Sequence, residues 1–153
     1  MTRMKQPQMT RLDLASVTTE TLAAGRIPEG VKVVRDFPEE KLSIKADREQ
    51  LRVALQNIIV NAVEAMDGNG ILTVCLRRTG DRAELSFADT GPGIPVENLD
   101  RIFEPLFTTK PKGVGFGLST TRLIFEKHGG TITARPGKGA TFVISLPLAT
   151  ADA

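Results

Sequence analysis

The chain has 153 residues, 41% of them apolar and 25% charged, which is enough for one globular domain with its own core. Its formal net charge is only +2 and its basic residues are scattered, so we expect no binding to nucleic acid and no direct contact with a membrane surface. Cys75 is the only cysteine, which excludes an internal disulfide, and it lies in an apolar run that predicts a core position. No apolar run is long enough to span a bilayer, and the start does not resemble a signal peptide.

The first ten residues are polar, and we expect them to be disordered. A short helix is predicted over residues 13–25, with Asp13 as its N-terminal cap and Gly25 at its end. The next two segments are strand-like and are separated by a turn-prone stretch, which predicts a hairpin. These segments are residues 31–37 and 42–46.

A longer helix is predicted to begin after the capping residue Asp47 and to end near Met66. A hairpin then follows, with strands at residues 71–78 and 82–89. Residues 89–117 form a loop rich in Gly and Pro that contains one short helix, at about residues 96–103. Loops of this length are usually functional.

The last predicted elements are a helix over residues 118–130, ended by glycines, and a hairpin over residues 131–148 with its turn at residues 136–139. Strands that come in hairpins predict a mixed, mostly antiparallel sheet. The helices are expected to cover one face of it, which gives a two-layer α/β sandwich.

The long central helix carries a polar stripe. At 100° per residue, Asn57, Asn61 and Glu64 fall within about 60° of one another, and the apolar residues fall on the opposite side. The stripe has two interpretations: a solvated helix face, or a site for a hard cation or polar ligand. The absence of Lys and Arg from the stripe favours the second, because Mg²⁺ is often bound by only one or two protein oxygens.

Two glycine-rich stretches could bind a ligand. Asp89 ends a strand and is followed by Thr-Gly-Pro-Gly-Ile, so its carboxylate could accept a hydrogen bond from an exocyclic amine beside an accessible backbone. The stretch Gly-Val-Gly-Phe-Gly-Leu-Ser (residues 113–119) runs directly into a helix, where free N–H groups attract phosphate. It matches neither the dinucleotide fingerprint nor the P-loop. Each stretch alone also occurs in ordinary turns.

Together the motifs form an ordered set: Asn-x-x-x-Asn-Ala-x-Glu (57–64), Asp-Thr-Gly-Pro-Gly-Ile (89–94), Ile-Phe-Glu-Pro-Leu-Phe-Thr-Thr-Lys (102–110), the glycine stretch (113–119) and Gly-Lys-Gly-Ala-Thr-Phe (137–142). This set closely resembles the ATP-binding catalytic domain of two-component sensor histidine kinases. These kinases belong to the GHKL superfamily and have the Bergerat fold, and the "FTTK" and "HGG" stretches point to their nitrogen-regulation-type branch.

The resemblance implies that the chain binds ATP and Mg²⁺. Asn57 and Asn61 would be the catalytic residues, with Asn61 as the Mg²⁺ ligand and Asn57 near metal-bound water or phosphate. Asp89 would accept the adenine amino group, and Glu64 would be either a phosphate-side water contact or a solvated residue. The other residues expected at the nucleotide, including a mobile lid, are Gly91, Gly93, Ile94, Phe103, Phe107, Thr109, Lys110, Gly113, Val114, Gly115, Phe116, Gly117, Leu118 and Thr141. Lys112 is a further candidate, which like Lys110 is chosen for its charge, and the family often has Thr at the position of Ala140.

Within the GHKL superfamily, one position distinguishes hydrolysis of ATP from phosphoryl transfer. Gyrase-type ATPases place a Glu four residues before the Mg²⁺-binding Asn, where this chain has Asn57, and an amide cannot take a proton from water. Phosphoryl transfer needs mainly positioning and charge neutralisation, which such a site supplies. The only histidine, His128, lies at a helix end and does not resemble the phosphorylated histidine of the family. The expected function is therefore transfer of the ATP γ-phosphoryl group to a histidine on a separate dimerisation domain.

The resemblance also divides the chain. Residues 1–29 would be a tail and a lead-in helix from the dimerisation domain, residues 30–148 the catalytic domain and residues 149–153 a disordered tail. The partners would be that dimerisation domain and, indirectly, a response regulator, and the fragment itself would be monomeric. The expected location is the cytoplasm, whether or not the parent protein is membrane-anchored. The alternatives are a stand-alone GHKL-type ATPase and an anti-sigma-type serine kinase or nucleotide-switch module.

Overall fold

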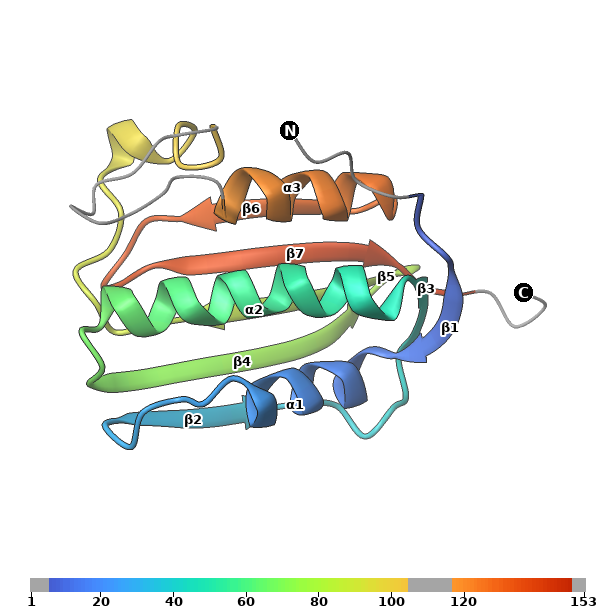
Figure 1. The fold of residues 1–153 in the computed structure, drawn as a ribbon, viewed down its shortest axis with the longest axis horizontal. Coiled ribbons are helices and arrows are strands. Elements are labelled where there is room, and N and C mark those ends of the chain that lie inside the picture. Colours follow the sequence, from blue (N-terminus) through green and yellow to red (C-terminus); the bar gives the residue numbers. More distant parts are fainter. Residues whose placement is uncertain (1–5, 105–116, 150–153) are drawn as a thin grey trace.

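The computed structural model describes residues 6–104 and 117–149 (Figure 1). Its elements in chain order are β1 (Thr10–Asp13), α1 (Leu14–Ala24), β2 (Val31–Asp36), β3 (Ser43–Ala46), α2 (Arg48–Ala65), β4 (Gly70–Thr79), β5 (Arg82–Ala88), a 3-10 helix (Val96–Asn98), α3 (Gly117–Lys127), β6 (Thr131–Arg135) and β7 (Thr141–Pro147). Within these described ranges, no helix is long and apolar enough to cross a membrane.

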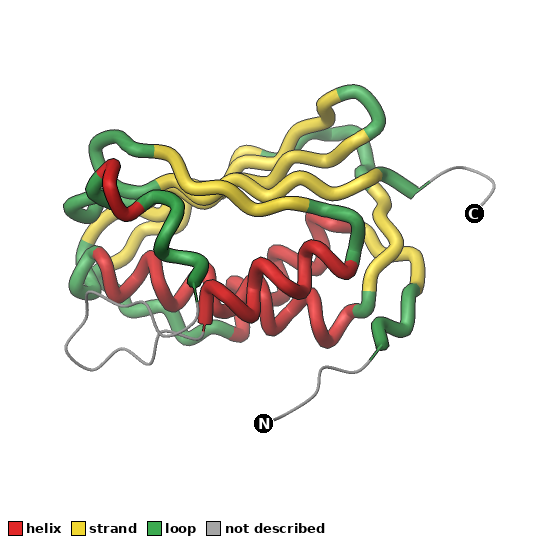
Figure 2. Tube along the Cα trace, turned by 90° about the horizontal axis from the view of Figure 1, so that it is seen from above, coloured by secondary structure: helices red, strands yellow, loops and turns green. Residues whose placement is uncertain are grey.

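The main sheet has five strands in the order β2-β4-β5-β7-β6. Only β2 and β4 are parallel, and the β4–β5, β5–β7 and β6–β7 pairs are antiparallel. Figure 2 shows α1, α2 and α3 together on one side of this sheet. The predicted two-layer α/β sandwich with a mostly antiparallel sheet is therefore confirmed, as are two of the three predicted hairpins, β4–β5 and β6–β7.

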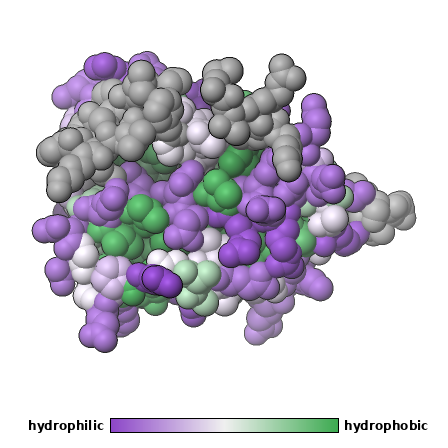
Figure 3. Space-filling view, viewed as in Figure 1, coloured by the Kyte–Doolittle hydropathy of each residue, from purple (hydrophilic) through white to green (hydrophobic). Residues whose placement is uncertain are grey.

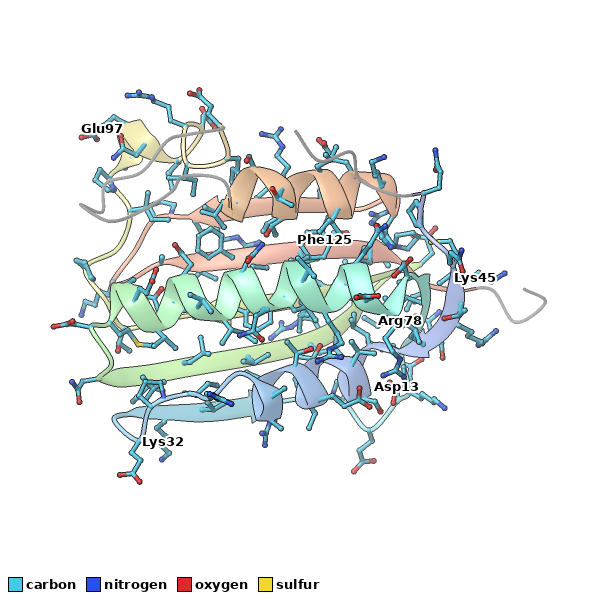
Figure 4. All side chains as sticks on the ribbon, viewed as in Figure 1. Asp13, Lys32, Lys45, Arg78, Glu97 and Phe125 are labelled. Atoms are coloured by element: carbon cyan, nitrogen blue, oxygen red, sulfur yellow. The ribbon has the colours of Figure 1, made fainter. Side chains whose placement is uncertain are left out.

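The core lies between the helices and the sheet because the strands alternate. In β5 the buried residues are Ala83, Leu85 and Phe87, and the residues between them face the other side. Phe125 of α3 is fully buried and points toward the sheet in Figure 4. Each large apolar side chain buried in this way contributes about 1.5–3 kcal/mol to folding.

The predicted hairpin between residues 31–37 and 42–46 is wrong. β2 pairs in parallel with β4, and β3 pairs with β1 in a separate two-stranded sheet. The connection between β2 and β3 instead reaches the start of α1, where the Leu42 carbonyl accepts a hydrogen bond from the Leu14 N–H at 3.0 Å. Both strands have the right local pattern, but their partners are set by contacts far along the chain.

The first ten residues were expected to be disordered, yet Thr10 begins β1 and the Gln8 N–H donates to the Asp47 carboxylate at 2.9 Å. Leu14 and Val17 of α1 are fully buried in the same core as α2 and the sheet. The described part of residues 1–29 therefore packs against the described core of residues 30–148.

Two smaller predictions also need correction. The helix expected over residues 96–103 is only a 3-10 helix, Val96–Asn98, followed by turns. Cys75 is half-buried rather than in the core, because Val74 and Leu76 take the inward-facing positions of β4. The outward position of Cys75 follows from strand alternation. The prediction was wrong because the neighbouring residues are also apolar, so the alternation is not visible in the sequence.

Candidate functional site

Four chain segments meet at one end of the molecule, on the left in Figure 1: the end of α2, the start of α3, the end of β5 and the start of β7. The polar stripe, the Asp89 motif and the described end of the second glycine stretch all belong to these segments. Figure 3 shows that this helix-bearing face is mostly hydrophilic, with small hydrophobic areas. The exposed large apolar residues of α2 and α3 are Val53, Val60 and Leu123.

Asp89 is the most deeply buried acidic residue of the site, with 4% of its surface exposed. Its Oδ1 accepts hydrogen bonds from the N–H groups of Gly91 at 2.9 Å and Ala140 at 3.1 Å. Its own N–H donates to the Ala140 carbonyl at 2.9 Å. The other oxygen, Oδ2, is buried and has no hydrogen-bond partner among the described residues. A buried, unpaired carboxylate oxygen is costly, so it indicates a place for a donor on a ligand.

The glycines of the Asp89 motif are also required by the local backbone geometry. A Cβ on Gly91 would lie 2.6 Å from the Ala65 carbonyl oxygen at the end of α2. Gly93 has φ +86°, in the left-handed region that side chains disfavour. The missing side chains therefore let the loop approach α2 as well as leave space beside Asp89.

Asn57 connects α2 to the start of α3. Its Nδ2 donates to the Gly117 carbonyl at 3.3 Å and to the Thr121 hydroxyl at 3.2 Å. Asn57 and Asn61 are half-buried and Glu64 is exposed, while the core side of α2 is fully buried. The predicted polar stripe thus lies along one side of α2, and Asn57 faces α3.

The donor set suits a metal that is shared with a ligand. Among the described residues, no group of three or more His, Cys, Asp or Glu side chains could hold a metal ion by itself. The stripe instead offers amide oxygens, and an ion of the Mg²⁺ type commonly takes one or two protein oxygens and completes its shell with phosphate and water. Asn61 and Asn57 fit that role.

Phe103 holds the described end of the long loop in place. It is 7% exposed and contacts Phe142 edge-to-face, with 6.3 Å between ring centroids and an interplanar angle of 82°. The Arg122 guanidinium carbon lies 5.7 Å from the Phe103 ring centroid. Ile94 and Leu118 are half-buried against the same core. Phe103 therefore connects the described part of the loop to both β7 and α3.

Several expected site residues cannot be placed beside Asp89, because they lie outside the described residues or face another side of the sheet. Phe107, Thr109, Lys110, Lys112, Gly113, Val114, Gly115 and Phe116 lie outside the described residues. Thr141 pairs with Ala88 and alternates with the buried Phe142, so its side chain faces the side of the sheet away from the helices. The preceding residue, Ala140, contacts Asp89 through its backbone.

His128 is buried, with 5% of its surface exposed, immediately after α3. Its Nδ1 lies 2.7 Å from the Ile124 carbonyl oxygen, and its Nε2 accepts a hydrogen bond from the Asp47 N–H at 3.1 Å. Because a carbonyl only accepts, Nδ1 donates its proton to the Ile124 carbonyl. The pKa of the Asp47 carboxyl is lowered, mainly by the N–H of Gln50 and then by that of Gln8. Both ring nitrogens of His128 are therefore bonded: Nδ1 to α3, and Nε2 to the residue that caps α2.

The sequence reasoning missed two residues of the site. Thr121 contributes a buried hydroxyl to Asn57, and the two are 64 residues apart, so no local pattern connects them. Ala140 supplies its N–H to Asp89 from 51 residues away. A correct register for the β5–β7 pair would have placed the backbone of Ala140 beside Asp89, but that pairing joins two different hairpins.

Comparison with known proteins agrees with this geometry. Residues 46–150 match the family model described as "Histidine kinase-, DNA gyrase B-, and HSP90-like ATPase". The chain is 46% identical over 108 residues to the "Sensor histidine kinase ZraS" of Klebsiella oxytoca, a match that covers 69% of this chain and 23% of the relative. The chain thus spans about a quarter of the length of this curated relative.

Two solved structures are similar along almost the whole chain. The catalytic domain of histidine kinase ThkA superposes with a TM-score of 0.83 at 31% identity, covering 92% of this chain and 95% of that domain. Full-length ShkA in complex with AMPPNP superposes with a TM-score of 0.82 at 29% identity, covering 94% of this chain and 32% of that protein.

Proposed function

The chain belongs to the family of histidine kinase-, DNA gyrase B- and HSP90-like ATPases, and from this membership we propose that it is the ATP-binding catalytic domain of a sensor histidine kinase. The proposed reaction transfers the γ-phosphoryl group of MgATP to a histidine on a dimerisation domain outside this chain. A response regulator would then receive the phosphoryl group from that histidine. The similarity to ZraS, which is named as a sensor histidine kinase, and to the catalytic domain of histidine kinase ThkA supports this choice within the family. The similarity to ShkA, whose structure holds AMPPNP, supports nucleotide binding.

The unpaired Oδ2 of Asp89 is the observation that carries the proposal. Because Oδ1 is already used by two backbone N–H groups, Asp89 is fixed in place and presents its second oxygen to a ligand. The exocyclic amino group of adenine is a donor that would satisfy this oxygen. Guanine has a carbonyl oxygen at the corresponding position, which a carboxylate would repel. The site is therefore expected to prefer ATP to GTP.

The phosphate end of the proposed site is formed by α2 and the start of α3. Asn61 would bind Mg²⁺ through its amide oxygen, and Asn57 would accept a hydrogen bond from a water of the metal shell. The metal would neutralise charge on the phosphates, and the protein would supply positioning. The first turn of α3 offers backbone N–H groups of the kind that favour phosphate.

Transfer is favoured over hydrolysis by the residue at position 57. Its amide cannot take a proton from an attacking water, and its nitrogen is already bonded to Gly117 and Thr121. Glu64 is exposed and lies one turn beyond Asn61, so it is the carboxylate to substitute if phosphate release is observed. The acceptor of the phosphoryl group must be outside this chain, because both ring nitrogens of the buried His128 are bonded.

The test is calorimetric titration of the wild-type chain and of Asp89→Asn with MgATP and MgGTP. Asparagine keeps one oxygen for the two backbone N–H groups but turns the second acceptor into a donor. Loss of a hydrogen bond to a charged group is worth about 1.5–3 kcal/mol, so ATP affinity should fall by about 10- to 100-fold and the preference for ATP over GTP should shrink.

Asp36→Asn is the matched control, since it removes the same charge from an exposed position on the edge strand β2. It should bind MgATP as the wild type does. An Asp89→Asn variant that keeps the wild-type fold, the wild-type ATP affinity and the wild-type preference would overturn the proposed role of Asp89.

A further inference from the structure

We propose that Thr121 is a positioning residue that fixes the orientation of the Asn57 side-chain amide for Mg²⁺-dependent nucleotide binding, an inference that rests on the function proposed above. Thr121 is fully buried in α3, one turn after Gly117. Its hydroxyl makes two contacts: it lies 2.7 Å from the Gly117 carbonyl oxygen and 3.2 Å from the Asn57 Nδ2.

The direction of each hydrogen bond follows from the groups involved. The Gly117 carbonyl can only accept, so the Thr121 hydroxyl must give its single proton to it. The hydroxyl oxygen can then only accept from Asn57. The group of Asn57 that faces α3 must therefore be the NH₂ group, which also donates to the Gly117 carbonyl at 3.3 Å.

This arrangement determines where the amide oxygen of Asn57 points. The Nδ2 of Asn57 faces both acceptors of α3, and the amide oxygen is on the other side of the planar amide group. A flipped amide would bring its oxygen against the Gly117 carbonyl oxygen and the acceptor side of the Thr121 hydroxyl. Of the two amide orientations, Thr121 therefore stabilises the one that leaves an acceptor available beside the polar stripe of α2.

Two other threonines make a control possible within the same chain. Thr18 and Thr21 of α1 are also fully or almost fully buried, and their hydroxyls bond to the carbonyls of Leu14 and Val17 at 2.8 Å. These contacts match the bond from Thr121 to Gly117, four residues back along a helix. They lie in α1, away from Asn57, so a Thr18→Val variant loses the same kind of helical bond without touching Asn57.

The experiment compares the wild type with Thr121→Val, Thr121→Ser and Thr18→Val. Valine has nearly the shape of threonine but lacks the hydroxyl, and serine restores it. The first readout is the ratio of ATP affinity with Mg²⁺ to ATP affinity in EDTA, measured by calorimetry. The second is the pair of Asn57 side-chain amide NMR signals in the ligand-free protein, identified by their loss in Asn57→Ala.

We expect Thr121→Val to lower the Mg²⁺-dependent ratio by about three- to tenfold, the range of one hydrogen bond, and to shift the Asn57 amide signals. Thr121→Ser should restore both readouts, and Thr18→Val should leave both as in the wild type. The proposal would be overturned by wild-type ratios and signals in Thr121→Val. It would also be overturned by an equal loss in Thr18→Val, which would indicate a general effect of helix stability.

The amide signals separate this proposal from the proposed function. If the wild-type chain does not bind MgATP, the proposed function fails. The positioning claim is then decided by the ligand-free spectra alone, because Thr121→Val must still shift the Asn57 amide signals and Thr121→Ser must still restore them.

Discussion

Replacing His128 with Phe should cost stability, because the buried imidazole joins the end of α3 to the start of α2. Phenylalanine fills a similar volume but leaves the Ile124 carbonyl and the Asp47 N–H without their partner. Each buried polar group left unpaired costs about 1–3 kcal/mol, and Asp47 is only half-buried, so water can partly replace its lost bond. The expected loss is about 2–4 kcal/mol, or a decrease in melting temperature of about 5–15 °C for a chain of this size.

The assay is urea and thermal unfolding followed by far-ultraviolet circular dichroism, since the chain has no Trp or Tyr for fluorescence. His128→Gln serves as the comparison, because its amide oxygen can reach toward the Asp47 N–H and should recover part of the loss. If His128→Phe unfolds within about 0.5 kcal/mol of the wild type, the two hydrogen bonds do not stabilise the helix pair and the reasoning is refuted.

Three further predictions concern the cap of α2, the Asp89 loop and the metal. Folding lowers the pKa of the Asp47 carboxyl from its ordinary value of 3.8. The ionised carboxylate therefore contributes fully to stability above pH 3.8, and this contribution is lost as the pH falls from 3.8 through the folded pKa. The difference in melting temperature between the wild type and Asp47→Asn should therefore be constant near neutral pH and shrink as the pH falls below 3.8. Gly91→Ala should lower the melting temperature, because its Cβ would meet the Ala65 carbonyl at 2.6 Å, whereas Gly117→Ala should not, because its nearest contact is at 3.9 Å. Asn61→Ala should remove the Mg²⁺-dependent part of ATP binding in calorimetry while its circular dichroism spectrum stays that of the wild type.

Most elements of the fold could be predicted because their burial pattern is local. The alternation in β5 and the apolar face of α2 each follow from residues close together in the sequence. The pairing of β2 and β3 could not be predicted in this way. Both segments look like strands, but β2 finds its partner in β4 and β3 finds its partner in β1.

In the candidate site, too, local motifs could be predicted from the sequence but contacts between distant residues could not. The motif around Asp89 predicted an acceptor, but only the structure shows that Oδ1 is used by Gly91 and Ala140 and that Oδ2 is buried without a partner among the described residues. The contact of Asn57 with Thr121 spans 64 residues and that of Asp47 with His128 spans 81. Neither contact leaves a periodic or local signal, because each depends on how α2 and α3 align.

The most direct measurement for the central claim is a phosphorus NMR time course of MgATP with the purified chain. We expect broadened or shifted ATP resonances and negligible release of phosphate, because the chain would hold the nucleotide while its histidine acceptor is on another domain. Unperturbed ATP resonances would contradict nucleotide binding. Steady release of phosphate would contradict the kinase assignment in favour of an ATPase and would make Glu64 the first residue to substitute.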